Sequence, residues 1–351
     1  MPDPVWQTLA KMPYAFGGPA GSGVIRSTPD DFQVDEDLGF EPDGEGEHVL
    51  LHLRKRQTNT IWLAAQIARL AAVPKRDVSY AGLKDRHAVT SQWFSVRLAG
   101  QPEPDWRELV SAQIELLRAE RHRRKLRPGA LRGNRFRLLI RELNADSGVL
   151  EQRLQQIRQT GMPNYFGEQR FGHGYGNLEQ AGALFERRPG RIDRKLRGLL
   201  ISAARSQLFN TVLVARISQG SWGEPISGDY MNLAGTRSGF AIEQVDGEIQ
   251  RRCLEMDIHP TGPLWGRGRP PVTGAALALE QVALEPYDSF RNGLEHVGLE
   301  QERRPLRIVI SDLCWSFTDG QNLLLEFSLP AGSYATVLLR ELITVDDTGL
   351  K

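Results

Sequence analysis

Residues that alternate between apolar and polar occur near both ends of this chain, and a long helical stretch separates them. His48 to Lys55 and Asn134 to Ile140 alternate in the first half, and Leu323 to Leu329 alternates close to the C-terminus. Such alternation is typical of strands with one face buried and one exposed. The C-terminal strands need partners, and the first half supplies strands with an apolar face left to cover. This predicts that the two ends of the chain build one body together.

The length supports a second body, because 351 residues exceed what one typical core holds. We therefore predict a discontinuous domain formed by residues 1–159 and 304–351. Residues 160–303 are expected to form an inserted second domain.

Helix signals are clear at two places. Apolar residues recur at helical spacing over Ile61 to Ala72, after a run of capping residues that ends at Thr60. Arg194 to Ser218 also predicts a helix, with a break near Arg205. Leu83 to Gln92, between two short strand-like segments, is expected to be a loop or a strand with a bent middle.

The second half contains two predicted β modules. Residues 222–240 are expected to form a small barrel-like or hairpin module with several turns. Arg307 to Phe317 and Leu323 to Leu329 predict a hairpin over the turn at Asp319 and Gly320.

Charge is distributed unevenly, although the formal net charge is only +1. Residues 30–47 contain nine acidic side chains and no basic one, whereas residues 118–141 contain ten Lys or Arg and one acid, Glu120. Such asymmetry can place a basic face beside an acidic one, or it can mark an ordinary solvated surface. Gly129 and Gly133 put part of the basic run in a loop, where RNA phosphates are often bound.

Several functional classes are disfavoured. No apolar run approaches the ~18 residues of a membrane helix, and residues 1–18 lack the order of a signal peptide. The two cysteines, Cys253 and Cys314, lie outside any CxxC or histidine pair, so we expect no metal site and a reducing cytoplasm. Gly17 to Gly23 lacks the Gly-Lys-Ser/Thr ending of a phosphate loop. A glycoside hydrolase would need a second carboxylate paired by motif, and none is evident.

Asp85 is the candidate with chemistry. It could be a structural ion-pair acid, a metal ligand or a nucleophile. Lys84 and Arg86 flank it, and opposite charges nearby favour the ionised carboxylate that a nucleophile requires. No second carboxylate or histidine lies at a usable ligand spacing, and His87 is interpreted as a surface or hydrogen-bonding residue. The residues by themselves leave the choice between an ion pair and a nucleophile open.

A resemblance to a known family decides the choice. Gly82-Leu-Lys-Asp-Arg-His-Ala-Val-Thr-Ser-Gln92 resembles the signature of the TruD family of tRNA pseudouridine synthases. Further similar motifs follow in the family's order along nearly the whole chain. They are Phe32 in Pro29-Asp-Asp-Phe-Gln-Val34, Asn134 and Phe136, Asn164 to Gly172, Arg205 to Asn210, and Phe327 to Thr336. Residues 220–305 carry the weakest resemblance.

The resemblance implies an α+β fold with a mixed, mainly antiparallel catalytic sheet flanked by helices and an inserted α/β TRUD domain. It implies an isomerase that converts uridine to pseudouridine in tRNA, at position 13. Asp85 would be the nucleophile, attacking C1′ of the ribose or C6 of the uracil. No metal or organic cofactor, membrane or protein partner is implied, and we expect a monomeric cytoplasmic enzyme.

The resemblance also implies the substrate-binding residues. Phe32, Phe136 and Phe327 are candidates for walls or stacking surfaces around the base, and ordinary core packing is the alternative for each. Asn134 could hold the uracil edge with its amide. Lys84 could orient Asp85 or neutralise a phosphate. A non-catalytic RNA-binding protein is the rival hypothesis, since it would share the basic run and the aromatic residues without requiring Asp85.

Overall fold

The computed structural model describes residues 6–127, 129–186 and 192–348. Its contacts divide the chain into two compact, discontinuous units, each described by itself below. The sheet unit comprises Ala20–Leu150, Ile310–Gly332 and Ile343–Lys351, and the helical unit comprises Met1–Pro19, Glu151–Val309 and Ser333–Leu342. These limits differ from the predicted domain boundaries, because the segments before residue 19 and over 333–342 pack with the middle of the chain. The assignment of 1–159 with 304–351 as the catalytic domain therefore stays a prediction.

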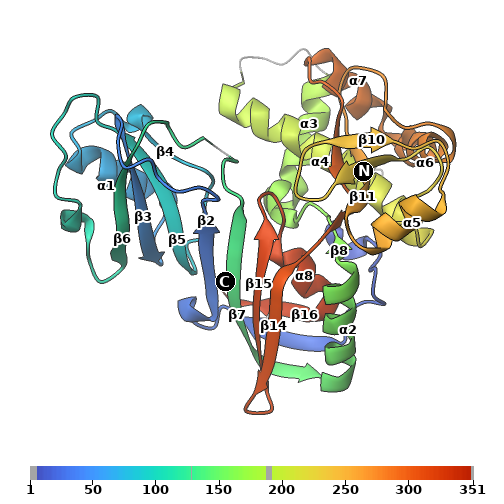
Figure 1. Cartoon of the computed structure of the whole chain (residues 1–351), viewed down its shortest axis with the longest axis horizontal. Coiled ribbons are helices and arrows are strands. Elements are labelled where there is room, and N and C mark those ends of the chain that lie inside the picture. The colour runs from blue at the N-terminus through green and yellow to red at the C-terminus, as the bar shows by residue number, and fades with distance from the viewer. Residues whose placement is uncertain (1–5, 128, 187–191, 349–351) are drawn as a thin grey trace. The chain divides into compact units, whose positions relative to one another are not determined.

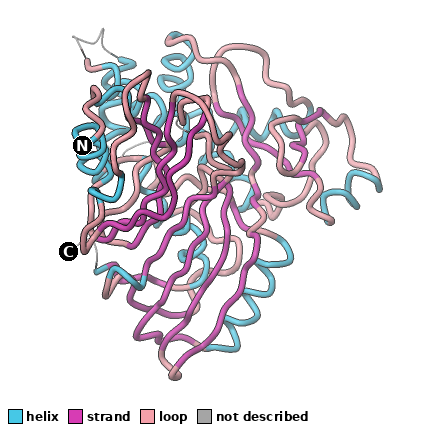
Figure 2. The backbone as a smooth tube through the Cα atoms, turned by 60° about the vertical axis from the view of Figure 1, so that its left-hand side comes forward, coloured by secondary structure: helices cyan, strands magenta, loops and turns pink. Residues whose placement is uncertain are grey.

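In the described part of the chain, the sheet unit contains a ten-stranded sheet (Figures 1 and 2). Seven strands follow the order β14 (Ser311–Thr318), β15 (Asn322–Pro330), β7 (Gly133–Ala145), β2 (Phe32–Asp37), β5 (Val89–Arg97), β3 (His48–Arg56) and β6 (Ile114–His122). The other three are β1 (Gly21–Ile25), β16 (Thr344–Asp347) and β4 (Val78–Tyr80). The pairs β2–β5 and β1–β16 are parallel, and the rest are antiparallel. The mixed, mainly antiparallel sheet and the α+β class are thus confirmed.

The two ends of the chain meet inside this sheet. β15 pairs with β7 along its whole length, so that Phe327 stands opposite Phe136. β7 pairs in turn with β2, where Phe32 stands opposite Leu138. The C-terminal strands therefore find their partners in the first half of the chain, as the alternation predicted.

Helix α1 (Thr60–Leu70) covers one face of this sheet beside β3, β5 and β6 (Figure 1). The Asn59 side chain caps it by accepting the N–H groups of Ile61 and Trp62 at 2.8 and 3.2 Å. Leu63 and Ile67 pack against alternate residues of the strands, among them Leu51. Burial of such side chains stabilises the unit by about 1.5–3 kcal/mol each.

The predicted C-terminal hairpin forms, but it begins later than expected. β14 and β15 pair from Ser311 opposite Ser328 to Thr318 opposite Asn322. Arg307–Ile308 belongs instead to β13, which pairs with β8 (Met162–Pro163) in the helical unit. Because Arg307 and Ile308 pair with another segment, the hairpin begins only at Ser311. Alternation in the sequence predicts a strand but does not identify its partner.

The helical unit combines helices with a four-stranded sheet in the order β10 (Gly239–Ala241), β9 (Tyr230–Leu233), β11 (Ile258–Leu264) and β12 (Glu302–Pro305). The module predicted over residues 222–240 is therefore a β9–β10 hairpin at the edge of an open sheet, not a barrel. The other helices are α2 (Ser147–Thr160), which crosses the unit boundary, α3 (Gly176–Glu186), α4 (Arg194–Ser218), α5 (Gly247–Leu254), α6 (Gly274–Leu284), α7 (Asp288–His296) and α8 (Ala335–Leu342).

Helix α4 runs unbroken for 25 residues, so the predicted break near Arg205 is wrong. Polar residues at this point find tertiary partners instead of ending the helix. Arg205 donates to the carbonyl oxygens of Leu264 and Trp265, and Asn210 both donates to and accepts from the backbone of Phe166.

Helix α4 is also long and apolar enough to span a membrane, but 56% of its most apolar window is buried and it packs against α3, α6 and β11. We interpret it as the core helix of this unit.

Candidate active site

Asp85 lies in the loop of residues 81–88 that joins β4 to β5, and three rigid elements hold this loop by hydrogen bonds. From β5, Gln92 Nε2 donates to the Gly82 carbonyl at 2.6 Å. From α1, Thr60 Oγ1 accepts the Lys84 N–H at 3.2 Å. From β3, Lys55 Nζ donates to the Asp85 carbonyl at 3.1 Å. The backbone of this connection is therefore anchored before the aspartate and at the aspartate's own carbonyl.

The Asp85 carboxylate faces a buried cation. Its Oδ2 lies 3.0 Å from Nη2 of Arg26, whose side chain is 7% exposed, whereas that of Asp85 is 37% exposed. Its Oδ1 accepts the His87 N–H at 2.9 Å. Arg26 also pairs with Asp347 of β16 and lies over the Phe32 ring at 4.0 Å. Both carboxylate oxygens are thus oriented by the protein, while the group remains partly exposed.

The cation beside Asp85 differs from the one expected. Lys84 and Arg86 were predicted to flank the carboxylate, but Lys84 Nζ lies 3.0 Å from Glu36 Oε1 and 2.5 Å from Asn134 Oδ1. Among the described residues, Arg86 makes no ion pair. Neighbours along an extended loop point in different directions, so adjacency in sequence did not identify the partner.

Glu36 and Lys84 form a buried pair beneath the loop. The Glu36 side chain is fully buried, and Oε2 accepts the Trp93 N–H at 2.7 Å. Burial raises the pKa of Glu36, and the Lys84 charge opposes that rise. Asn134 accepts from Lys84 through Oδ1, which leaves its amide nitrogen as a donor.

Phe32, Phe136 and Phe327 meet as a layer across β2, β7 and β15. The rings of Phe136 and Phe327 stack at 5.1 Å and 16°, and Phe32 meets Phe136 edge to face at 6.5 Å and 85°. Their exposed fractions are 4%, 8% and 1%. The layer is a packed aromatic floor, because Phe136 and Phe327 cover one another.

Strand alternation places the predicted residues on one face of the sheet. Asn134 and Phe136 are two apart on β7 and stand opposite Glu36 and Val34. Val34 pairs in turn with Thr90 of β5, and Thr90 stands opposite Lys55 of β3. The ammonium of Lys55 reaches the Asp85 loop. Six residues singled out in the sequence thus share one region: Phe32, Lys84, Asp85, Asn134, Phe136 and Phe327.

Sequence reasoning missed Arg26, Lys55, Glu36 and Asp347. Arg26 has a φ of 57°, and the sequence contains no signal for a non-glycine residue in the left-handed region at this position. Lys55 did leave a signal, since it continues the odd-numbered buried positions of β3 and is itself 0% exposed. A lysine at a buried position of a strand is unusual and points to a role.

The acidic and basic runs pair in part with each other, through four of the ten Lys or Arg residues. Arg118 lies 2.9 Å from Glu41, and Arg141 lies 2.8 Å from Asp31. Similar ion pairs join Arg123 to Glu45, Arg132 to Asp37 and His122 to Asp43. Among the described residues of the run, Arg124, Lys125, Arg127 and Arg135 are exposed and make no ion pair. Fewer cations are available for RNA than the sequence indicated.

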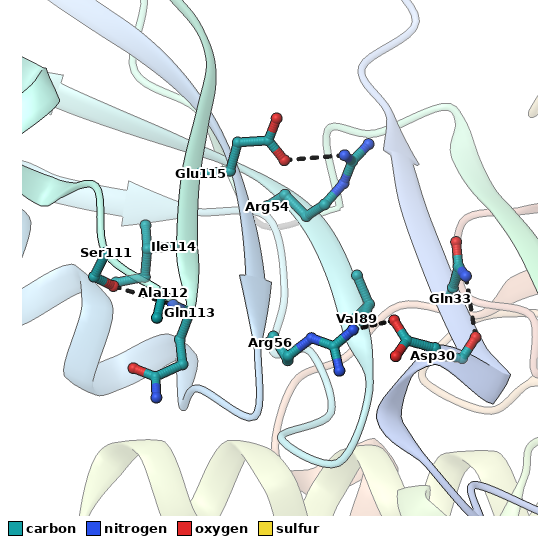
Figure 3. Close-up of a pocket in the computed structure, with 10 residues that line it drawn as sticks. All are labelled: Asp30, Gln33, Arg54, Arg56, Val89, Ser111, Ala112, Gln113, Ile114 and Glu115. Carbon is teal, nitrogen blue, oxygen red and sulfur yellow. Dashed lines mark hydrogen bonds and ion pairs between the residues drawn. The ribbon is translucent and has the colours of Figure 1, made fainter.

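Two pockets lie away from Asp85. One, of about 300 Å³, is lined by Gln33 and Val89, which face the side of the sheet opposite Val34 and Thr90. Its arginines, Arg54 and Arg56, pair with acids across it (Figure 3). The other, of about 410 Å³, lies in the helical unit beside Trp222 and Arg307. The second pocket also contains the Cys253 thiol, which donates to the Gly223 carbonyl and accepts from Arg307. Burial raises the pKa of Cys253, so this thiol is not an activated nucleophile.

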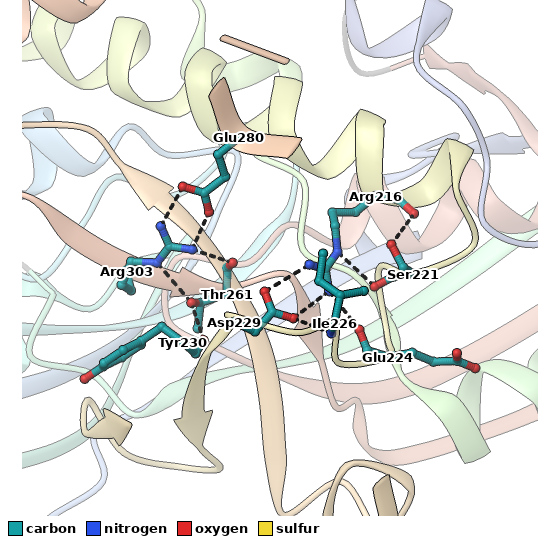
Figure 4. Close-up of polar contacts among 9 residues, drawn as sticks. All are labelled: Arg216, Ser221, Glu224, Ile226, Asp229, Tyr230, Thr261, Glu280 and Arg303. Atoms are coloured by element: carbon teal, nitrogen blue, oxygen red, sulfur yellow. Dashed lines mark hydrogen bonds and ion pairs between the residues drawn. The ribbon is translucent and has the colours of Figure 1, made fainter. Parts of the chain in front are cut away.

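Buried charges also occur within the helical unit (Figure 4). Both nitrogens of the Arg216 fork lie 3.0 Å from Asp229, and Arg303 binds Glu280 at 2.6 and 3.1 Å. These carboxylates are bound by arginine and sealed from solvent, so we interpret them as structural. No group of His, Cys, Asp and Glu suited to a metal occurs within residues 6–127, 129–186 and 192–348.

Comparison with known proteins gives a consistent result. A family model described as tRNA pseudouridine synthase D (TruD) matches residues 9–188 and 176–342. A protein from Methylococcus capsulatus with the name tRNA pseudouridine synthase D is 53% identical over 338 residues, which cover 96% of each chain. One of the same name from Nitrosococcus oceani is 49% identical and covers 95% of this chain and 94% of its own.

A solved structure is also similar. A crystal structure of a Methanosarcina mazei protein assigned to TruD superposes with a TM-score of 0.70 and covers 98% of both chains. Because its identity is 21%, this likeness supports the fold alone.

Proposed function

Because the chain belongs to the TruD family of tRNA pseudouridine synthases, we propose that it isomerises uridine to pseudouridine in tRNA, at position 13, with Asp85 as the nucleophile. One observation carries the assignment of Asp85. Its carboxylate is accessible, paired to a buried arginine, and held in a loop anchored from three elements above an aromatic floor. An accessible carboxylate oriented in this way suits covalent catalysis.

The reaction exchanges one glycosidic bond for another. In one route, Asp85 attacks C1′, a bond from its oxygen to C1′ forms, and the N1–C1′ bond breaks. In the other, Asp85 adds to C6 of the ring before N1–C1′ breaks. In both routes, the uracil turns in the site and a C5–C1′ bond forms, which releases Asp85. C5 then loses its proton, and N1 gains one. Atoms balance without an oxidant, a reductant or a cofactor.

The surrounding residues receive positioning roles. Arg26 orients the Asp85 carboxylate through Oδ2. Its positive charge also stabilises the negative charge that returns to the carboxylate when the bond between Asp85 and the substrate breaks. The free amide nitrogen of Asn134 can donate to a uracil carbonyl. Lys84 holds Asn134 in place and compensates Glu36. Phe32, Phe136 and Phe327 close the base of the site to water.

The target base must leave its stack in folded tRNA, at a cost of a few kcal/mol. Phosphate contacts offset this cost. The basic run supplies them through the exposed arginines that have no acidic partner, Arg124, Arg127 and Arg135.

Loss of the hydrogen on C5 provides the test. Purified protein should release tritium from tRNA made with [5-³H]uridine, and Asp85→Asn should lower that release by at least ~10³-fold while leaving tRNA binding intact. Chelator should have no effect. Retained tritium together with normal tRNA binding would favour the rival RNA-binding hypothesis. Release that persists in Asp85→Asn would remove the nucleophile assignment.

We also propose that the enzyme is a monomer in the cytoplasm. The two cysteines are free in the structure, Cys253 buried and Cys314 exposed, which fits a reducing compartment. Light scattering of the purified protein at micromolar concentration should give a mass near 39.3 kDa. A stable dimer would contradict the proposal.

A further inference from the structure

Lys55 is a buried cation that, within the described part of the chain, has no hydrogen-bonded carboxylate. It lies on β3 between β5 and β6, opposite Thr90 and Ile114, and is 0% exposed. Its Nζ donates to two backbone carbonyls, that of Thr58 at 2.7 Å and that of Asp85 at 3.1 Å. Burying an ammonium costs several kcal/mol, which neutral acceptors do not fully offset. This cost suggests that the buried lysine has a functional role.

The atom that Lys55 holds identifies the function. The Asp85 carbonyl belongs to the loop of residues 81–88, whose first and last residues, Ala81 and Ala88, accept backbone hydrogen bonds from Gly129 and Gln57. Gln92 and Thr60 bond Gly82 and Lys84, before the aspartate, whereas Lys55 bonds the peptide of Asp85 itself. Fixing this peptide limits the backbone rotation that would swing the carboxylate away from Arg26.

We propose that Lys55 is a positioning residue of the isomerase, and that its buried ammonium orients the Asp85 carboxylate through the Asp85 backbone carbonyl. The inference rests on the proposed function of Asp85 and adds a residue that does not touch substrate. Charge makes the contact stronger, because a hydrogen bond from an ammonium is roughly twice as strong as one from a neutral amine.

The charges that face Lys55 come from two other elements. Glu36 lies on β2, and Lys84 and Asp85 lie in the loop. Burial lowers the pKa of Lys55 to about 8, with opposing effects from Asp85 and Glu36. The ammonium is therefore present at neutral pH and titrates within the working range of the protein.

The test replaces Lys55 by methionine, which fills the same space without charge or donor. Lys55→Met should lower single-turnover kcat about 10- to 100-fold, because a small misplacement of a reacting group has effects of this size. Its dissociation constant for tRNA should stay within about twofold of wild type. The melting temperature should stay within a few degrees, since removing the buried charge offsets the loss of two hydrogen bonds.

The pH profile separates positioning from simple packing. The ratio of wild-type kcat to that of Lys55→Met should fall as pH rises through 8, because the wild-type ammonium loses its proton. Asp85, Glu36 and Lys84 are present in both proteins, so the ratio isolates Lys55. Lys75→Met, which removes an exposed lysine of the same unit, should leave kcat unchanged.

Two results would overturn the inference. One is an unchanged kcat in folded Lys55→Met. The other is a kcat loss that tracks the unfolded fraction and shows a pH-independent ratio, which would make Lys55 a stability residue. Tritium release by wild type decides the proposed function separately. An active wild type with an equally active Lys55→Met removes only the positioning role.

Discussion

At the scale of single residues, Arg26 is the side chain on which the Asp85 geometry most depends. It is nearly buried between two carboxylates and stacked on Phe32. Arg26→Met should destabilise the protein by about 1–3 kcal/mol, because Asp347 and the partly exposed Asp85 lose their cation, and should also lower kcat. Asp347→Asn keeps the contact to Asp85, so it should lower stability while changing kcat less. Urea unfolding and single-turnover kinetics on both variants check this, and equal kcat losses would contradict it.

Lys55 gives a prediction for pH at the same scale. Its pKa is about 8 in the folded protein and 10.5 in an unfolded chain. Between these values the unfolded state binds more protons, so Lys55 makes wild-type stability rise with pH. The free energy of unfolding of Lys55→Met relative to wild type is therefore expected to be constant below pH 8 and to decline from pH 8 to 10.5. Urea titrations at pH 7, 8, 9 and 10 measure it, and a flat difference would show that burial does not depress this lysine.

At the scale of elements, the aromatic floor joins the C-terminal hairpin to the strands of the first half. Phe327 on β15 is 1% exposed and stacks on Phe136 of β7. Phe327→Ala should lower the free energy of unfolding by about 3–5 kcal/mol, because a large cavity opens between paired strands. Phe317→Ala, on the neighbouring β14 and 36% exposed, should change it by about 0.5 kcal/mol or less. Equal effects at the two positions would mean that the hairpin docks without the floor.

The loop of residues 81–88 shows how elements create a site. It is short, backbone hydrogen bonds hold its two ends, and α1, β3 and β5 supply side-chain hydrogen bonds within it. Hydrogen bonds from α1, β3 and β5 therefore give the loop the rigidity that a nucleophile needs.

At the scale of the whole molecule, charge pairing limits which cations of the basic run remain without an acidic partner. Six of the ten pair with acids, four of them with the acidic run. Of the four described cations left without an ion pair, three are exposed arginines, Arg124, Arg127 and Arg135. Replacing these three by glutamine should weaken tRNA binding and reduce the slope of log affinity against log salt by about 2–3, if each meets one phosphate.

The matched control removes the same charge from arginines that already have acidic partners. Arg54, Arg97 and Arg251 are exposed and paired with Glu115, Glu47 and Glu248. Their triple glutamine variant should leave the salt slope almost unchanged. Filter binding at several salt concentrations compares the two, and equal slopes would show that net charge alone matters.

The sequence by itself determined that both ends of the chain form one sheet, because alternation leaves apolar faces that only strands from the other end can cover. It also determined the family and pointed to Asp85 and the five other residues that share its region, since motif residues keep their order whatever the fold does. Tertiary structure alone decided which charges pair. Arg26 rather than Lys84 or Arg86 faces Asp85, and four cations of the basic run pair with the acidic run. Lys55 reaches the Asp85 loop from a strand thirty residues earlier. These partners are distant in sequence, and an ion pair or hydrogen bond depends on a separation in space that spacing along the chain does not encode.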